Sequence, residues 1–121
     1  MNQDSREAAG KIGPQGSLLV WGYRPDIFAY TRMPAGSRFL DSQPLTGVLA
    51  DRHLTNSEVI APEWAAQNRR ELIGTKPDWI VDGLGPLNEN LAITQYADLK
   101  KWLEDYQEAG STKFSVIYKR R

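Results

Sequence analysis

The sequence contains no cysteine, which excludes disulfide bonds, thiolate catalysis and cysteine-based zinc sites. Its 15 basic and 15 acidic residues cancel, so no overall charge draws the chain toward nucleic acid. His53 is the single histidine, and one histidine with scattered carboxylates offers no ligand spacing typical of zinc or calcium. We therefore expect no metal ion, no cofactor and no nucleic-acid partner.

No stretch of the sequence approaches the roughly 20 apolar residues that a membrane-spanning helix needs. The longest apolar run lies between Ser17 and Gly22, and the first fifteen residues lack the apolar centre of a signal peptide. The chain as given is therefore expected to be soluble. With 121 residues and 40% hydrophobic content, it is long enough for one domain with one core.

The N-terminal half alternates helical and extended patterns. Residues 1–14 are polar and predict either a short helix or a partly disordered segment. The apolar run over 17–21 predicts a strand covered on both faces, and residues 25–32 predict a helix that begins at a proline. From 33 to 56 prolines and glycines interrupt the pattern, and only 38–42 suggests an edge strand.

The C-terminal half shows more regular patterns. We expect a helix over 62–73, a second buried strand over 78–83, a helix over 94–110 and a strand over 114–118. The helix over 94–110 is predicted from four residues that recur at three- and four-residue steps: Tyr96, Leu99, Leu103 and Tyr106.

The order of these elements predicts a small single α/β domain over residues 1–121. Strands separated by helices normally join by right-handed crossovers, which make the strands parallel. We therefore expect a three- to four-stranded, mainly parallel sheet flanked by helices.

Two adjacent segments resemble a known family. Residues 17–30 read Ser-Leu-Leu-Val-Trp-Gly-Tyr-Arg-Pro-Asp-Ile-Phe-Ala-Tyr, and residues 34–39 read Pro-Ala-Gly-Ser-Arg-Phe. They resemble the "VWGYxPxxY" and "PASRF" segments of the soluble C-terminal domain of polyprenyl-phosphate-dependent membrane glycosyltransferases, the relatives of dolichyl-phosphate-mannose protein mannosyltransferase. Residues 77–82, 99–106 and 116–120 resemble later segments of that domain, while Gly36 departs from its pattern.

The resemblance implies an extracytoplasmic domain on the periplasmic face of a bacterial inner membrane. The family takes its sugar from a polyprenyl-phosphate donor, and its catalytic acidic residue lies in the membrane part, which would precede this chain in the same protein. No catalytic residue is therefore transferred to this sequence. The domain itself would guide a glycan or protein acceptor, bind the lipid-linked sugar, or brace the membrane part.

A ligand crevice is expected outside the carboxyl ends of the two parallel strands, as in other open α/β sheets. There Arg24 can hold an anionic group and Asp82 can accept hydrogen bonds from sugar hydroxyls. Alternatively, Arg24 pairs with Asp82 or Asp26 and Tyr23 caps the core. The candidate residues are Gly22, Tyr23, Arg24, Asp26, Asp82 and Gly83.

Two other functions stay open at this point. The first is a free-standing α/β binding or regulatory domain that forms a homodimer through an exposed sheet edge. The second is a small hydrolase that uses Asp51 and His53, although no activated serine accompanies them. The four tryptophans suit either a core or a sugar-stacking surface. The terminal Lys119-Arg120-Arg121 suits either lipid phosphates or solvent.

Overall fold

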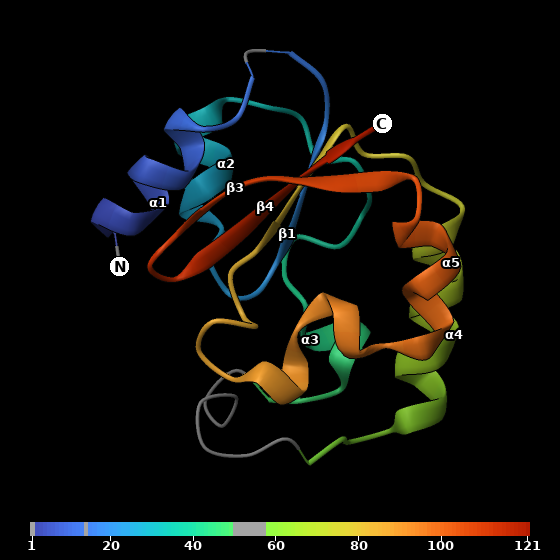
Figure 1. Ribbon diagram of the computed structural model, residues 1–121. Coiled ribbons are helices and arrows are strands. Elements are labelled where there is room, and N and C mark those ends of the chain that lie inside the picture. The colour runs from blue at the N-terminus through green and yellow to red at the C-terminus, as the bar shows by residue number, and fades with distance from the viewer. Residues whose placement is uncertain (1, 14, 50–57) are drawn as a thin grey trace.

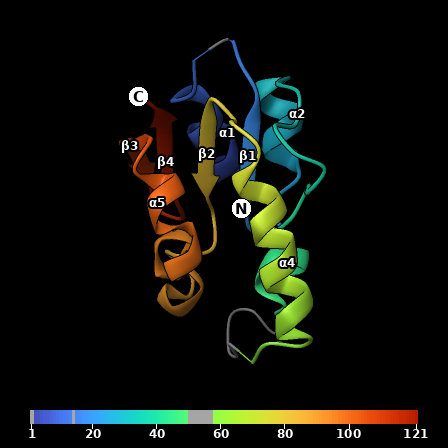
Figure 2. The same ribbon diagram turned by 90° about the vertical axis from the view of Figure 1, so that its right-hand side faces the viewer.

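The computed structural model describes residues 2–13, 15–49 and 58–121. Four strands form one sheet in the order β1-β2-β4-β3, and Figure 2 shows them side by side. β1 and β2 are parallel, whereas β4 is antiparallel to both of its neighbours. The strands are β1 (Leu18–Trp21), β2 (Trp79–Asp82), β3 (Tyr106–Thr112) and β4 (Ser115–Arg120).

The α/β class is confirmed, but the expectation of a mainly parallel sheet is wrong. β3 and β4 form a hairpin in which Thr112 pairs with Ser115, so only Lys113 and Phe114 join them. Two strands joined by so short a connection must be antiparallel. Only β1 and β2, which helices separate along the chain, keep the parallel arrangement.

The helix expected over 94–110 is also wrong. Short 3₁₀ turns occupy 89–99, and a single α-helical turn follows before the chain enters β3. Residues 107–112 contain almost no apolar side chain, so their backbone gains more from pairing with β4 than from a helix with nothing to bury. These elements are η1 (Glu89–Leu91), η2 (Ile93–Gln95), η3 (Ala97–Leu99) and α5 (Lys100–Leu103).

Helices cover both faces of the sheet (Figure 1). α1 (Asn2–Gly10) and α2 (Asp26–Thr31) lie on one face, and α3 (Gln43–Thr46), α4 (Pro62–Ile73) and α5 lie on the other. The helices expected near the N-terminus, at 25–32 and at 62–73 are therefore confirmed. The edge strand expected over 38–42 does not form; the outer edge of β1 is met instead by an isolated bridge at Ala35.

The side chains of β1 alternate between two apolar cores, which explains its unbroken apolar run. Leu18 and Val20 pack with α1 and α2, while Leu19 and Trp21 pack toward α3, α4 and α5. Of the tryptophans, only Trp64 is largely exposed, at 51%. Among the described residues, none of the helices has the length and apolar character needed to span a membrane.

Candidate functional site

The carboxyl ends of β1 and β2 meet at one edge of the sheet. Trp21 pairs with Asp82, and the Gly83 amide donates to the Trp21 carbonyl at 2.7 Å. Gly22 has a φ of +148°, and a Cβ built on it would lie 3.3 Å from the Gly83 carbonyl carbon. Both the backbone conformation and the close approach therefore favour glycine at this point.

Arg24 turns toward the α1 side of the sheet. Its Nη2 lies 2.7 Å from Asp4 Oδ2, and its Nη1 donates to the Phe114 carbonyl at 3.0 Å. Ser5 Oγ accepts two further hydrogen bonds from the same guanidinium. The side chains of Arg24 and Asp4 are only 6% and 7% exposed, so this ion pair is buried. The ion-pair partner of Arg24 is thus Asp4, where the sequence suggested Asp82 or Asp26.

Asp82 lies on the opposite face of the sheet and is 2% exposed. Its Oδ1 accepts from the amides of Leu84 and Gly85 at 2.9 and 2.8 Å, and its Oδ2 accepts from the Ile93 amide at 2.9 Å. Burial raises the pKa of Asp82, and these three hydrogen bonds oppose the rise. The carboxylate therefore fixes the loop that follows β2.

Three half-buried tyrosines lie on the Asp82 side of the sheet: Tyr23, Tyr96 and Tyr118. Burial raises the pKa of Tyr96 to about 12, and it also raises the pKa of Tyr118; the nearby Asp82 charge contributes to both shifts. Tyr23 is close enough to Tyr96 to affect its pKa in the same way. We call these three tyrosines and Asp82 the tyrosine cluster.

Local contacts hold the tyrosine cluster in place. The Tyr23 hydroxyl donates to the Val48 carbonyl at 2.6 Å. The Tyr96 ring meets Trp21 edge to face at 5.3 Å between centroids. The guanidinium of Arg69, a residue of α4, lies 4.8 Å from the Tyr96 centroid. Such aromatic and cation–π contacts fix ring orientation as well as adding stability.

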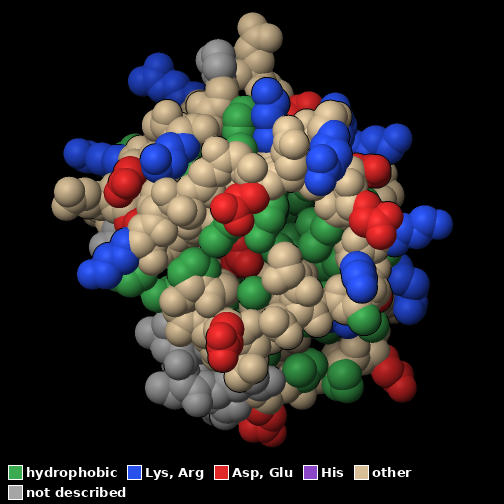
Figure 3. All heavy atoms as spheres, in the orientation of Figure 1, with side chains coloured by type: hydrophobic (Ala, Val, Ile, Leu, Met, Phe, Trp, Pro, Cys, Tyr) green, Lys and Arg blue, Asp and Glu red, His purple; other side chains and the backbone are tan. Residues whose placement is uncertain are grey.

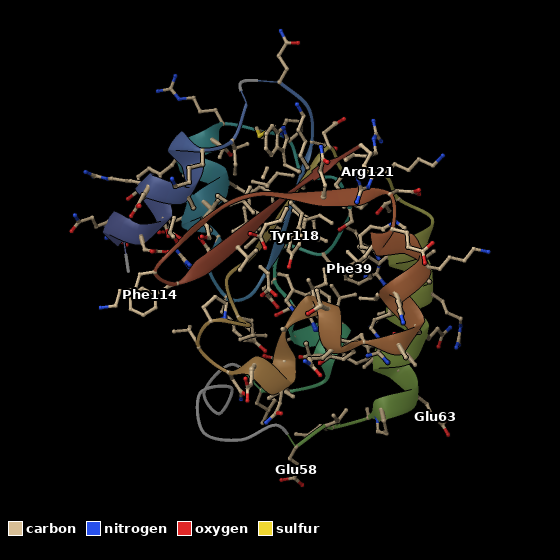
Figure 4. All side chains as sticks on the ribbon, in the orientation of Figure 1. Phe39, Glu58, Glu63, Phe114, Tyr118 and Arg121 are labelled. Atoms are coloured by element: carbon tan, nitrogen blue, oxygen red, sulfur yellow. The ribbon has the colours of Figure 1, made fainter. Side chains whose placement is uncertain are left out.

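The surface is hollowed on this side of the sheet. Figure 3 shows a depression near the centre of the face, with hydrophobic side chains in it. In the same view Figure 4 places Tyr118 and Phe39 near the centre, between the hairpin above and the 3₁₀ turns below. Since Tyr118 is only half-buried, part of its ring faces solvent here.

The structure thus divides the six predicted site residues between the two faces. Tyr23 and Asp82 come together in the tyrosine cluster, beside the close contact of the two glycines. Arg24 is directed to α1, and Asp26 lies in the first turn of α2 on that same face. Tyr96 and Tyr118 are not among the residues predicted for the site, because the spacing of both is that of regular core positions.

Asp51 and His53, the residues of the predicted hydrolase alternative, lie outside the residues that the structure describes. Within the part of the chain that the structure describes, no group of three histidine, cysteine or acidic side chains has an arrangement suited to a metal ion. Comparison of the chain with protein-family models, with curated proteins and with solved structures finds no match.

Proposed function

We propose that this chain is the extracytoplasmic C-terminal domain of a membrane-bound glycosyltransferase that uses a polyprenyl-phosphate sugar donor. In this proposal the domain binds the glycan part of the acceptor, and the transfer reaction takes place in the membrane part. The support from the sequence is the resemblance over residues 17–39. The support from the structure is that this segment supplies β1, the tight turn after it and one member of the tyrosine cluster.

The observation that carries the proposal is the tyrosine cluster. Sugars offer C–H faces that pack on aromatic rings and hydroxyls that exchange hydrogen bonds, so half-buried tyrosines suit them on both counts. The Tyr96 and Tyr118 hydroxyls, whose pKa burial raises above the ordinary 10, are protonated at neutral pH, and a protonated hydroxyl can donate or accept. Asp82 contributes by holding the loop beneath the rings, since its oxygens already receive three amide hydrogens.

The glycan site is tested by titrating the 121-residue chain with neutral oligosaccharides and following amide and tyrosine NMR signals. We expect shifts at Tyr23, Tyr96 and Tyr118. Replacing Tyr118 with alanine should weaken binding by about 0.5–1.5 kcal/mol, the value of one aromatic contact. Tyr30→Ala is the matched control, because Tyr30 is 37% exposed and belongs to α2, which lies on the other face of the sheet. Equal losses in both variants, or shifts confined to α1 and α2, would contradict the proposal.

The membrane part is tested separately. The natural reading frame upstream of this segment should encode several stretches of about 20 apolar residues. A frame without them would contradict the glycosyltransferase assignment while leaving a glycan-binding domain intact.

A further inference from the structure

A recess lies at the end of the sheet where β2 begins and β4 ends. It is an open groove of about 830 Å³, within the range of small-ligand sites. Residues from the end of α4, from α5, from the start of β3 and from the end of β4 line it, so it exists only in the folded chain. We call it the terminal groove.

Two aromatic residues, Trp102 and Tyr106, line the floor of the terminal groove. The Trp102 indole donates from Nε1 to the Thr75 carbonyl at 3.0 Å, and the Tyr106 hydroxyl donates to the Pro77 carbonyl at 2.6 Å. The two rings lie 5.3 Å apart between centroids. The polar atoms of both rings are satisfied within the protein, and the rings are almost buried, with Trp102 7% and Tyr106 4% exposed. Most of the apolar surface that the groove presents therefore belongs to Ile73, which is 37% exposed.

The rim of the groove carries charges of both signs. Arg120 forms an ion pair with Asp78, with 3.0 Å between Nη2 and Oδ1. Asp98 forms an ion pair with Arg69, with 2.8 Å between Oδ2 and Nε. Among the described residues, the ammonium groups of Lys76 and Lys101 have no such ion-pair partner.

Arg121 adds a third cation to the same rim. Its Nε donates to the Glu104 carbonyl at 3.1 Å, and its Nη1 lies 3.5 Å from Gln107 Oε1. The side-chain carboxylates of Glu104 and Asp105 lie on the same rim without an ion-pair partner among the described residues.

We propose that the terminal groove binds an anionic monosaccharide, a sugar ring that carries a phosphate or carboxylate group. Lys76, Lys101 and Arg121 come from three separate segments and can share one anionic group. The rim carboxylates accept hydrogen bonds from ring hydroxyls, and the apolar floor, chiefly Ile73, packs against the C–H face of the ring. A simple anion would use only the cations, and a simple apolar ligand would use only the floor. The site is separate from the tyrosine cluster and does not depend on the proposed function.

The test is an NMR titration of the 121-residue chain with glucose 1-phosphate and with glucuronate, compared with glucose and with inorganic phosphate. We expect the two anionic sugars to shift the Trp102 indole N–H and nearby amides, and to bind at least about tenfold more tightly than glucose or phosphate alone. Phosphate that binds as tightly as glucose 1-phosphate would overturn the proposal in favour of a non-specific anion site. So would the absence of shifts in the groove with either anionic sugar.

A matched pair of variants checks the assignment of the cations. Lys101→Ala should weaken binding of glucose 1-phosphate by about tenfold, the scale of one charge-assisted hydrogen bond. Lys100→Ala removes the same charge from the neighbouring residue of α5, which is exposed and does not line the groove, and should leave binding unchanged. Equal effects of the two substitutions would contradict a defined site. Titration with neutral oligosaccharides in the Lys101→Ala variant should still shift the tyrosine cluster, so the two proposals fail independently.

Discussion

Arg24 and Asp4 form an ion pair whose Nη2 and Oδ2 lie 2.7 Å apart, with both side chains more than nine-tenths buried. Asp4 also receives hydrogen bonds from the Thr112 hydroxyl and the Phe114 amide. One pair of charges therefore joins α1, the turn after β1 and the β3–β4 hairpin. A buried pair of this kind defines which surfaces meet, even where its net contribution to stability is small.

Removing one member of this pair should destabilise the fold strongly. In Arg24→Met the Asp4 carboxylate stays buried without its cation, at a cost of about 3–5 kcal/mol in the free energy of unfolding. The control is Glu71→Gln, which removes one charge of an ion pair whose members are 63% and 52% exposed, and which should cost less than about 1 kcal/mol. Urea denaturation measures both, and similar losses would contradict a special role for the buried pair.

The same pair predicts a pH dependence. Burial by itself raises the pKa of Asp4, but hydrogen bonds from Thr112 and Arg24 outweigh it, and the pKa lies below its ordinary 3.8. The stabilisation is therefore complete above the ordinary value and is lost as pH falls through the lower value of the folded protein. Asp4→Asn lacks this titration, so the stability difference between wild type and variant should shrink in acid. A difference that grows on acidification would contradict the assignment.

The elements that were predicted correctly are those whose pattern comes from their own residues. The strand expected over 17–21 forms as Leu18–Trp21, which is apolar at every position because both of its faces are covered. The helix at 62–73 begins with Pro62 and ends before Gly74, so local signals mark both ends. In both cases the tertiary structure agrees with the local preference.

The elements that were missed depend on partners distant in the chain. Gly110 marks the irregular register of a strand, between Glu108 and Gly110, and not the end of a helix. β3 is a polar edge strand, so its sequence does not alternate between apolar and polar residues. Its stability comes from the hydrogen bonds that it makes with β4. The terminal groove and the Arg24–Asp4 pair were missed for the same reason, since their members come from separate segments.

The close contact between the two strand ends yields a prediction about Gly22. Alanine at this position must adopt a φ near +148° and place its Cβ 3.3 Å from the Gly83 carbonyl carbon, which should cost about 1–3 kcal/mol. Gly10→Ala is the control, because a Cβ there meets nothing within 4 Å and lies in a helix. Thermal unfolding should show a lower midpoint for the first variant and an unchanged or higher midpoint for the second. A tolerated alanine at Gly22 would show that the turn relaxes.

Asp82 is expected to hold the loop after β2 through its three accepted hydrogen bonds. In Asp82→Asn the amide nitrogen cannot accept, so at least one backbone N–H loses its partner, at a cost of about 1–3 kcal/mol. Hydrogen exchange should become faster at the amides that face the new amide nitrogen, which are either that of Ile93 or those of Leu84 and Gly85. The control is Asp26→Asn, in which a half-buried carboxylate of α2 changes without effect on this loop. Unchanged exchange at all three amides, those of Leu84, Gly85 and Ile93, would contradict the role of Asp82.

The charge of Asp82 also predicts a pH effect opposite in sign to that of Asp4. Burial raises the pKa of Asp82 above its ordinary 3.8, so the folded protein holds this proton more tightly than the unfolded chain does. Stability due to this group therefore falls as pH rises through the raised pKa, and it is constant above that value. As the pH rises from 3.8 to the raised pKa of Asp82, the stability of the wild type relative to Asp82→Asn should decrease. The stability of the wild type relative to Asp4→Asn should instead increase as the pH rises from acid. Parallel slopes in the two comparisons would show that the three amide hydrogen bonds outweigh the burial of the Asp82 carboxylate.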